Sequence, residues 1–260
     1  MENKKPKVIL LVAGEGKRLR PYTLDCPKCM VEIDGISLID RQISVLHAES
    51  LYDIVMIGGY KAQMLKKFGT KLKINPDYSK TNMLWTLFCA EEELEGDVIV
   101  SYGDIVYSRE ILQELLKSTA DISVVIDKGW KSYWQARSED PLDDAETLKL
   151  RADGVIMEIG QLPKTLEEIE GQYIGLMKFS AKGVRQIKQI FRDAVKTSEL
   201  LGKPLENSYM TDLLQATINK GFLVTSVPIC GEWIEVDEVS DMDLQLTHDR
   251  LNSIQRSLDS

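Results

Sequence analysis

Short apolar runs alternate with segments of helical spacing along the first half of the chain. Runs at residues 8–12, 53–59 and 97–102 are rich in β-branched and aliphatic side chains and too short for helices. They are therefore predicted to be strands that are buried on both faces. Between the first two runs, residues 37–49 carry apolar side chains on one helical face, and Ser37 is a suitable N-cap. This alternation predicts parallel βαβ units with right-handed crossovers.

The pattern is less regular further along. Ala152-Asp153-Gly154 separates two short apolar segments and predicts a hairpin turn. Apolar residues show no regular spacing over residues 129–144, and this segment is expected to form an active-site lid or substrate loop. Further helices are expected at residues 61–68, 81–94, 111–116, 181–201, 209–220 and from 240 nearly to the C-terminus, and further strands at 71–74, 121–126, 147–151, 155–160, 173–179 and 222–228.

A glycine-rich loop follows the first strand. Gly14 and Gly16 allow a backbone to approach a phosphate closely and to turn its N–H groups toward it. Lys17 and Arg18 add positive charge, and Lys28 supplies a third cation that is expected to act on the reacting phosphate. The loop is not a P-loop, which has four residues between its glycines and then Gly-Lys-Ser/Thr, and it lacks the third glycine of the dinucleotide fingerprint. On spacing alone, phosphate binding and an ordinary tight turn both stay open.

The position of one acidic residue suggests a metal ligand. Asp104 comes directly after the strand at 97–102 and Gly103, where a carboxylate suits a magnesium ion held against phosphates. It could instead cap the next helix, but Ser108 already fits that position. Asp237 stands in a Glu-x-Asp sequence so far along the chain that only the fold could bring it to Asp104.

Length, composition and charge exclude several classes of protein. The 260 residues, 43% hydrophobic and 28% charged, suffice for one large α/β domain or two small ones. The sequence shows no interdomain linker, so one domain over residues 1–260 is expected. A net charge of −9 argues against nucleic acid or an anionic membrane as partner. The longest apolar run near the N-terminus is too short for a signal peptide or a membrane span, so a soluble cytoplasmic protein is expected.

Two local features each allow two interpretations. Cys26 and Cys29 have CxxC spacing, which could indicate a redox or a zinc role. A zinc site would need a second ligand pair, so packing beside Lys28 is the favoured interpretation. The aromatic residues of the 129–144 segment could enclose a cationic head group through cation–π contacts, or could pack the loop down. These aromatic residues are Trp130, Tyr133 and Trp134.

The stretch at residues 7–39 as a whole resembles the signature of the nucleotidyltransferase superfamily, which includes sugar-nucleotide pyrophosphorylases and phosphocholine cytidylyltransferases. That signature runs strand, Ala-Gly-x-Gly-x-Arg-Leu-x-Pro, Thr, Pro-Lys, short strand, Gly and Leu-Ile. The chain departs from it at Val12, where alanine is usual. The matching residues are Ala13, Gly14, Gly16, Arg18, Leu19, Pro21, Thr23, Pro27, Lys28, Gly35, Leu38 and Ile39.

The resemblance implies a fold and a set of roles. The implied fold is Rossmann-like and nucleotide-diphospho-sugar transferase-like: a mixed, mainly parallel sheet with helices on both faces and a small β insertion at about residues 128–180. Arg18 and Lys28 would be catalytic, and Asp104 and Asp237 would hold Mg²⁺. The implied nucleotide-binding residues are Val12, Ala13, Gly14, Glu15, Gly16, Lys17, Arg18, Gly59, Asn82 and Gly103. The candidate acceptor-binding residues are Tyr133, Trp134, Lys149, Glu158, Lys164, Tyr173 and Glu235.

Within the superfamily, Gly58-Gly59-Tyr60, Asn75-Pro76 and Asn82 resemble the phosphocholine and aminoalkylphosphonate cytidylyltransferases. The implied reaction is transfer of CMP from CTP to phosphocholine, 2-aminoethylphosphonate, a phospho-amino acid or amide, or a similar small metabolite, with release of pyrophosphate. A homodimer is an expected assembly. The alternatives are a sugar-1-phosphate nucleotidyltransferase using UTP, dTTP or GTP, a catalytically silent nucleotide-binding regulatory subunit, and a metal-dependent glycosyltransferase. The last usually carries Asp-x-Asp after the central strand, which is absent after Gly103.

Overall fold

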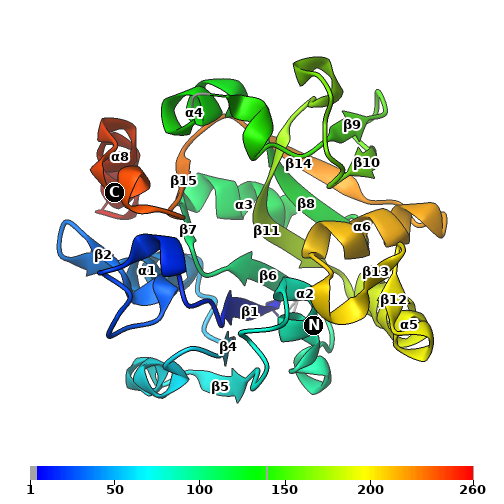
Figure 1. The fold of residues 1–260 in the computed structure, drawn as a ribbon, viewed down its shortest axis with the longest axis horizontal. Coiled ribbons are helices and arrows are strands. Elements are labelled where there is room, and N and C mark those ends of the chain that lie inside the picture. The colour runs from blue at the N-terminus through cyan, green and yellow to red at the C-terminus, as the bar shows by residue number, and fades with distance from the viewer. Residues whose placement is uncertain (1–4, 139, 260) are drawn as a thin grey trace.

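A central seven-stranded sheet organises the protein, seen in a computed structural model that describes residues 5–138 and 140–259 (Figure 1). The strand order is β14-β8-β11-β6-β1-β4-β5. β11 runs antiparallel to both of its neighbours, whereas all other adjacent pairs are parallel, as the predicted mainly parallel sheet requires. The strands are β1 (Lys7–Val12), β4 (Ile54–Gly58), β5 (Lys71–Ile74), β6 (Val98–Tyr102), β8 (Ile122–Asp127), β11 (Gln172–Phe179) and β14 (Thr225–Ile229).

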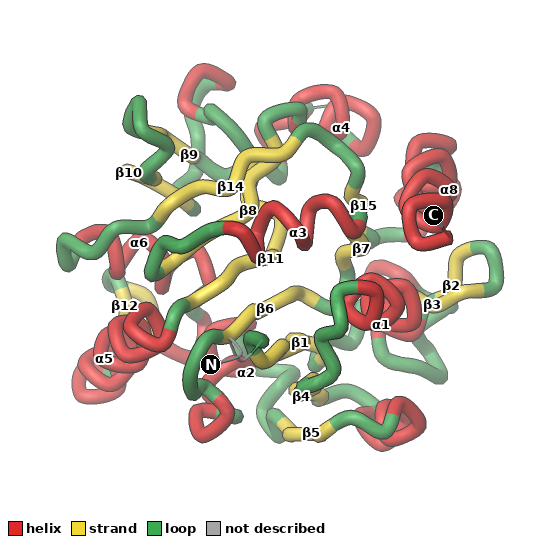
Figure 2. Tube along the Cα trace, turned by 180° about the vertical axis from the view of Figure 1, so that it is seen from behind, coloured by secondary structure: helices red, strands yellow, loops and turns green. Residues whose placement is uncertain are grey.

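Helices cover both faces of this sheet (Figures 1 and 2). In β1, Val8 and Leu10 belong to one apolar cluster, while Ile9 and Leu11 belong to the other, because successive side chains of a strand point to opposite faces. The first cluster includes residues of α1 (Leu38–Ala48), α3 (Arg109–Lys117), α4 (Trp130–Arg137) and α8 (Gln245–Asp259), and the second includes residues of α2 (Met83–Phe88), α5 (Ala181–Thr197) and α6 (Met210–Asn219).

Two helices, α1 and α3, begin at the predicted caps. The N–H of Asp40 donates to Ser37 Oγ at 3.2 Å, and Ser108 takes the same place before α3. The C-terminal helix is different from the prediction, because it is divided into α7 (Val239–Asp243) and α8. Asp241 accepts hydrogen bonds from the N–H groups of residues 237 and 238, which starts the first of these helices early. The 3-10 turns are η1 (Lys17–Leu19), η2 (Lys28–Met30), η3 (Ala62–Phe68), η4 (Glu91–Glu93), η5 (Pro141–Asp143), η6 (Leu166–Glu168) and η7 (Leu205–Asn207).

Short ladders supplement the central sheet. The hairpin of β9 (Leu148–Leu150) and β10 (Ile156–Ile159) is the one predicted from its turn. The strand at 173–179, expected within the insertion, belongs instead to the central sheet as β11. The other ladders pair β7 (Ile105–Tyr107) with β15 (Trp233–Glu235), β2 (Glu32–Ile33) with β3 (Ile36–Ser37), and β12 (Glu199–Leu200) with β13 (Lys203–Pro204).

The predicted lid at residues 129–144 is wrong for much of its length, since residues 130–137 form helix α4. Trp130, Tyr133 and Trp134 are buried in the core, and the ring of Tyr133 lies 5.3 Å from that of Trp233. These positions follow the i, i+3, i+4 spacing of one helical face. Packing, and not an open aromatic enclosure, is therefore the interpretation that the structure supports. Among the described residues, none of the helices is both long enough and apolar enough to pass through a bilayer.

Candidate active site

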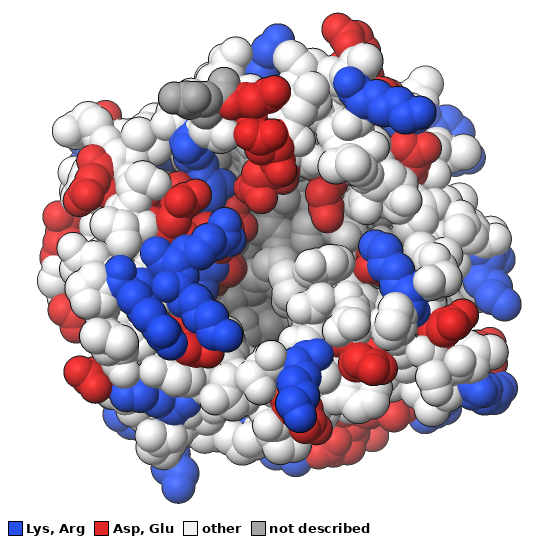
Figure 3. All heavy atoms as spheres, in the orientation of Figure 1, with Lys and Arg blue, Asp and Glu red and all other residues white. Residues whose placement is uncertain are grey.

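A cavity of about 420 Å³ opens beyond the carboxyl ends of β1 and β6, where parallel sheets commonly bind ligands. Figure 3 shows a hollow in this face of the molecule, with basic side chains along one rim and acidic side chains above it. Gly59 does not line the cavity itself. It packs against Tyr78, which is a lining residue, so closely that a Cβ on Gly59 would lie 2.5 Å from Cβ of Tyr78. The predicted nucleotide-binding residues that do line the cavity are Val12, Ala13, Gly14, Glu15, Gly16, Lys17, Arg18, Asn82 and Gly103.

The glycine loop packs directly against Lys28. Gly16 has φ of 65°, and a Cβ at this position would lie 3.1 Å from the Lys28 side chain. The Lys28 N–H donates to the carbonyl of Gly14 at 3.3 Å, and Thr23 Oγ1 donates to that of Gly16 at 2.8 Å. Glycine thus allows a left-handed turn and a close approach that a side chain would obstruct. The Arg18 side chain stays 61% exposed at the cavity, where a ligand can reach it.

The turn at Gly103 and Asp104 is held from two directions. The Gly103 N–H donates to the carbonyl of Leu11 at 3.0 Å, and a Cβ on Gly103 would lie 2.6 Å from Val12 Cγ1. From α1, Gln42 Nε2 donates to the carbonyl of Tyr102 at 2.9 Å. Sequence reasoning missed Gln42, because a buried glutamine on a helix gives no signal of the loop that it will hold.

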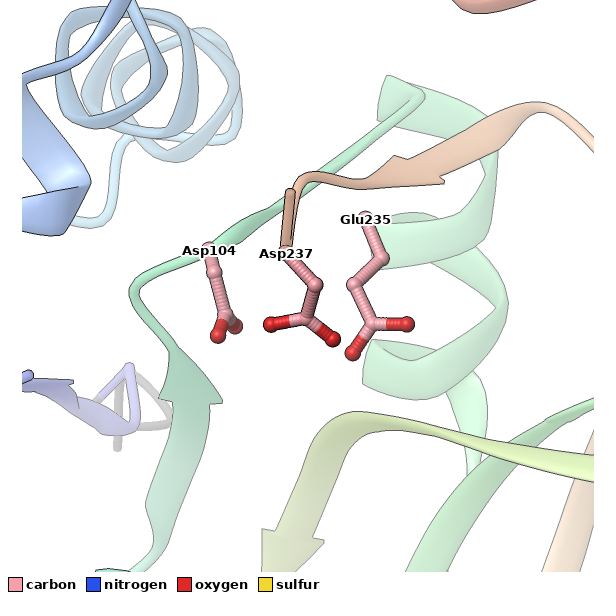
Figure 4. A group of neighbouring side chains, drawn as sticks. All are labelled: Asp104, Glu235 and Asp237. Atoms are coloured by element: carbon pink, nitrogen blue, oxygen red, sulfur yellow. The ribbon is translucent and has the colours of Figure 1, made fainter. Parts of the chain in front are cut away.

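The ladder of β7 and β15 brings the distant acidic residues together. Glu235 pairs with Ile105, and the N–H of residue 236 donates to the carbonyl of Asp104 at 3.0 Å. Carboxylate oxygens of Asp104, Glu235 and Asp237 consequently lie within 4.8 Å of one another. Figure 4 shows the three side chains next to each other and pointing the same way, with Asp237 between the other two.

Lys28 bridges two of these carboxylates. Its Nζ lies 2.6 Å from Asp104 Oδ2 and also donates to Asp237 Oδ1, while Arg18 lies 3.4 Å from Asp237. Burial disfavours the charged form of Lys28, but the two carboxylates outweigh burial and raise its pKa above the usual range. Burial likewise opposes ionisation of Asp237, yet the Lys28 ammonium holds the pKa of that carboxyl below its usual value. The pair is therefore charged at neutral pH.

The three carboxylates have the chemistry of a site for a hard divalent cation. All the donors are oxygen atoms, which Mg²⁺ prefers. Asp104 Oδ1 is buried and has no hydrogen-bond partner among the described residues, so a lone pair is free to bind an ion. Burial, followed by the charge of Asp237, raises the pKa of Glu235, and a cation at this place would reverse that effect.

Arg137 lies behind the carboxylates and was missed by sequence reasoning. Its guanidinium donates to Glu235 at 2.7 Å and to Asp241 at 2.9 Å, and it lies 3.8 Å from Asp237. The guanidinium also lies 5.3 Å from the ring centre of Tyr133, whose hydroxyl accepts the Glu235 N–H at 2.9 Å. The aromatic residues of α4 thus support the acidic cluster from the core.

We expect Arg137→Met to lower the free energy of unfolding by about 3 kcal/mol, because it leaves buried carboxylates without their cation. Urea denaturation measures this difference. Arg192→Met is the matched control, since Arg192 pairs with Glu91 at 2.8 Å but is 61% exposed, and such surface pairs contribute at most about 1 kcal/mol. Equal losses in the two variants would contradict this role of Arg137.

The remaining candidate acceptor residues are separated. Lys149 pairs with Glu158 at 3.1 Å on the β9–β10 hairpin, and Lys164 is exposed; none of the three lines the cavity. Tyr173, in contrast, packs edge-on against Tyr102 with ring centres 5.7 Å apart, and Tyr102 is a lining residue. Of the acceptor candidates, Tyr173 therefore packs on a cavity residue and Glu235 belongs to the acidic cluster, whereas Tyr133 contacts the Glu235 backbone from the core.

Comparisons with known proteins identify the family. The profile of the MobA-like NTP transferase domain matches residues 8–173. The chain belongs to this family. A CTP:phosphoglutamine cytidylyltransferase of Campylobacter jejuni is 39% identical to this NTP transferase over 249 residues, which cover 92% of the chain and 98% of the relative. A choline-phosphate cytidylyltransferase of Streptococcus pneumoniae is 32% identical over 117 residues, which cover 44% of the chain and 51% of that relative.

Solved structures confirm the predicted fold of this NTP transferase. A CTP:phosphocholine cytidylyltransferase from Streptococcus pneumoniae superimposes with a TM-score of 0.71, covering 94% of this chain and 99% of that one. At 22% sequence identity this likeness concerns the fold alone. The nucleotide-diphospho-sugar transferase-like architecture inferred from residues 7–39 is therefore correct.

Proposed function

We propose that this NTP transferase is a cytidylyltransferase that moves CMP from CTP to a small phosphorylated acceptor and releases pyrophosphate. The observation that carries the proposal is one cavity lined by the glycine loop, Lys28, Asp104 and Asp237. The names of the relatives supply the nucleotide and the kind of acceptor: CTP with phosphoglutamine in one and choline phosphate in the other. A phosphorylated amide or amino alcohol is therefore the first acceptor to test.

In this reaction an acceptor phosphate oxygen attacks the α-phosphorus of CTP, and the bond from that phosphorus to the bridging oxygen of pyrophosphate breaks. Such chemistry depends on alignment and on neutralisation of negative charge. The loop amides and Arg18 bind the departing phosphates, while Lys28 neutralises charge between the α-phosphate and the incoming oxygen. Asp104 and Asp237, with Glu235, would hold Mg²⁺, which supplies further neutralisation of the triphosphate when it is bound.

A substrate panel tests the proposal. We expect pyrophosphate release in MgCl₂ with CTP and a non-sugar acceptor, and little with ATP, GTP, UTP or dTTP; reactions without acceptor are the control. Release only with another nucleotide and a sugar phosphate would favour a sugar-1-phosphate nucleotidyltransferase instead. Binding of CTP without turnover of any acceptor would favour a regulatory subunit, although such a subunit has no need to keep Arg18, Lys28, Asp104 and Asp237 together.

Other expectations from the sequence stay predictions. They are one domain over residues 1–260, a cytoplasmic location and a homodimer. Analytical ultracentrifugation of the purified chain would test the homodimer directly, since a monomer has a mass of 29.4 kDa.

A further inference from the structure

We propose that Gln42 of α1 is a positioning residue that sets the affinity of the acidic cluster for Mg²⁺. This inference rests on the metal role of Asp104 in the proposed function, and it concerns the backbone that carries this carboxylate. Asp104 lies in a turn at residues 103–104, between β6 and β7. Gly103 gives the turn little stiffness of its own, because glycine has the widest choice of backbone conformations. The direction of the Asp104 side chain therefore depends on groups that hold the turn from outside.

The amide of Gln42 holds both ends of this turn. Its Nε2 donates to the carbonyl of Tyr102 at 2.9 Å, before the turn, and to the carbonyl of Ile105 at 2.5 Å, after it. A glutamine amide has two N–H groups, so one is available for each side of Asp104. Removal of the amide would take a donor from both carbonyls. The bond from the Val236 N–H to the Asp104 carbonyl would remain, so the turn would loosen but not unfold.

The orientation of the Gln42 amide is itself fixed by the sheet. Ser101 Oγ donates to Gln42 Oε1 at 3.2 Å, so the amide oxygen faces Ser101 and the nitrogen faces the turn. The exposed fraction is 1% for Gln42 and 0% for Ser101, so water does not compete for these bonds. A flipped amide would bring its oxygen against two carbonyls, which burial makes unfavourable.

The position of Gln42 in the core indicates a role beyond packing. Its neighbours on the buried face of α1 are mostly apolar, among them Leu38, Val45 and Leu46. A leucine would fill this place with no polar group to satisfy. The hydrogen bonds that the amide makes with described residues all go to residues 101, 102 and 105, next to Asp104. Such a conflict between an apolar pattern and a polar residue is typical of positions that support a functional site.

The metal site is sensitive to the direction of Asp104. Mg²⁺ accepts little distortion of its octahedral oxygen ligands, which lie at about 2.0–2.1 Å from the ion. Carboxylate oxygens of Asp104, Glu235 and Asp237 already lie within 4.8 Å of one another. If the turn were loose, it would have to be ordered when the ion binds, and the ion would bind more weakly. Residues that orient metal ligands typically contribute about 10- to 100-fold to metal affinity.

The test is Gln42→Leu, which keeps a similar volume and removes both donors. In calorimetric titration of MgCl₂ with CTP present, and CTP alone as the blank, we expect the dissociation constant for Mg²⁺ to rise about 10- to 100-fold. In pyrophosphate release, the Mg²⁺ concentration that gives half the maximal rate should rise by the same factor. The kcat at saturating Mg²⁺ should stay within about fivefold of wild type, because all three carboxylates remain. Asp104→Asn, in contrast, should not recover at high Mg²⁺.

Arg41→Met is the matched control. Arg41 is the next residue on α1, is 6% exposed, and donates to the carbonyl of Ile33 at 2.8 Å, in the β2–β3 hairpin. Both variants should lower the midpoint of urea denaturation, but Arg41→Met should keep the wild-type dissociation constant for Mg²⁺. Equal dissociation constants in the wild type and Gln42→Leu, or an equal rise in Arg41→Met, would overturn the inference.

Ser101→Ala tests the same inference if Gln42→Leu does not fold. It keeps Gln42 but removes the group that orients the amide, so the dissociation constant for Mg²⁺ should rise about threefold or more. In a folded Gln42→Leu background the same change should add less than about twofold, because the amide is already gone. An unchanged Mg²⁺ affinity in Ser101→Ala would count against the inference. A wild type that binds Mg²⁺ and CTP but turns over no acceptor would overturn the proposed function alone.

Discussion

Lys28→Ala is expected to lower kcat by about 1000-fold or more, because it removes the cation placed to meet charge that develops at the α-phosphate. The Lys28 ammonium is the centre of the site, with its Nζ 2.6 Å from Asp104 and bonded also to Asp237. Its stem packs against Gly16, so the position of the charge is fixed before any substrate arrives. Steady-state pyrophosphate release with CTP and an active acceptor measures the loss.

Two further variants separate charge from position. Lys28→Arg keeps the positive charge but replaces the compact ammonium group with a broad, planar guanidinium. The glycine loop packs closely on this side chain, so the guanidinium cannot take the same position. We therefore expect kcat to stay at least about 100-fold below that of the wild type. Lys182→Ala is the control, since Lys182 pairs with Asp121 on the exposed start of α5. It should have wild-type kcat. Near-normal turnover by a folded Lys28→Ala protein would remove Lys28 from the proposed mechanism.

The local part of the site could be predicted because its chemistry is contiguous in the sequence. The loop at Gly14 and Gly16 follows β1 directly, and the same short stretch supplies Arg18 and Lys28. The backbone conformation, the cavity lining and the charge are all set there within β1, the glycine loop and the two short 3-10 segments η1 and η2. A pattern of residue types therefore suffices to locate them, although their roles in catalysis stay predictions.

The distant part could not be predicted from the residues alone. Asp104 and Asp237 meet through the pairing of two three-residue strands, β7 and β15, which have no distinct sequence pattern. Resemblance to the superfamily, and not spacing, was what linked them. Arg137 was missed for a related reason: its role depends on carboxylates that other elements of the fold contribute.

Helix α4 was misread because one of its buried positions is charged. Trp130, Tyr133, Trp134 and Arg137 share one face of a helix. An arginine is normally counted as polar, so the helical spacing of the buried residues is not recognised in the sequence. The Arg137 side chain is only 8% exposed because it pairs with the buried carboxylates. Predictions from the spacing of apolar residues fail in this way where a helix buries a charged residue that serves a functional site.

Asp104→Asn is expected to reduce kcat by about 1000-fold at Mg²⁺ concentrations that saturate the wild type, because an amide cannot supply the anionic ligand that the cation requires. Asn keeps the shape of the side chain and the hydrogen-bonding geometry of the turn at Gly103, so the fold should persist. Asp237→Asn should reduce kcat by a comparable factor, because Asp237 lies between the other two carboxylates and also contacts Lys28 and Arg18. Removing metal with EDTA should bring the wild type down to the level of these variants.

Calorimetric titration of MgCl₂ into each protein with CTP present gives an independent measurement of the same site. The wild type should bind the ion, and both Asn variants should bind it at least about 10-fold more weakly, since each loses one anionic ligand. Asp153→Asn is the control, because Asp153 pairs with Arg151 in the β9–β10 turn, outside the lining of the cavity. Its kcat and its affinity for Mg²⁺ should equal those of the wild type. If Asp104→Asn also kept the wild-type kcat and Mg²⁺ affinity, the acidic cluster would not be a metal site. The ion pairs between Lys28 and these carboxylates would then have only a structural role.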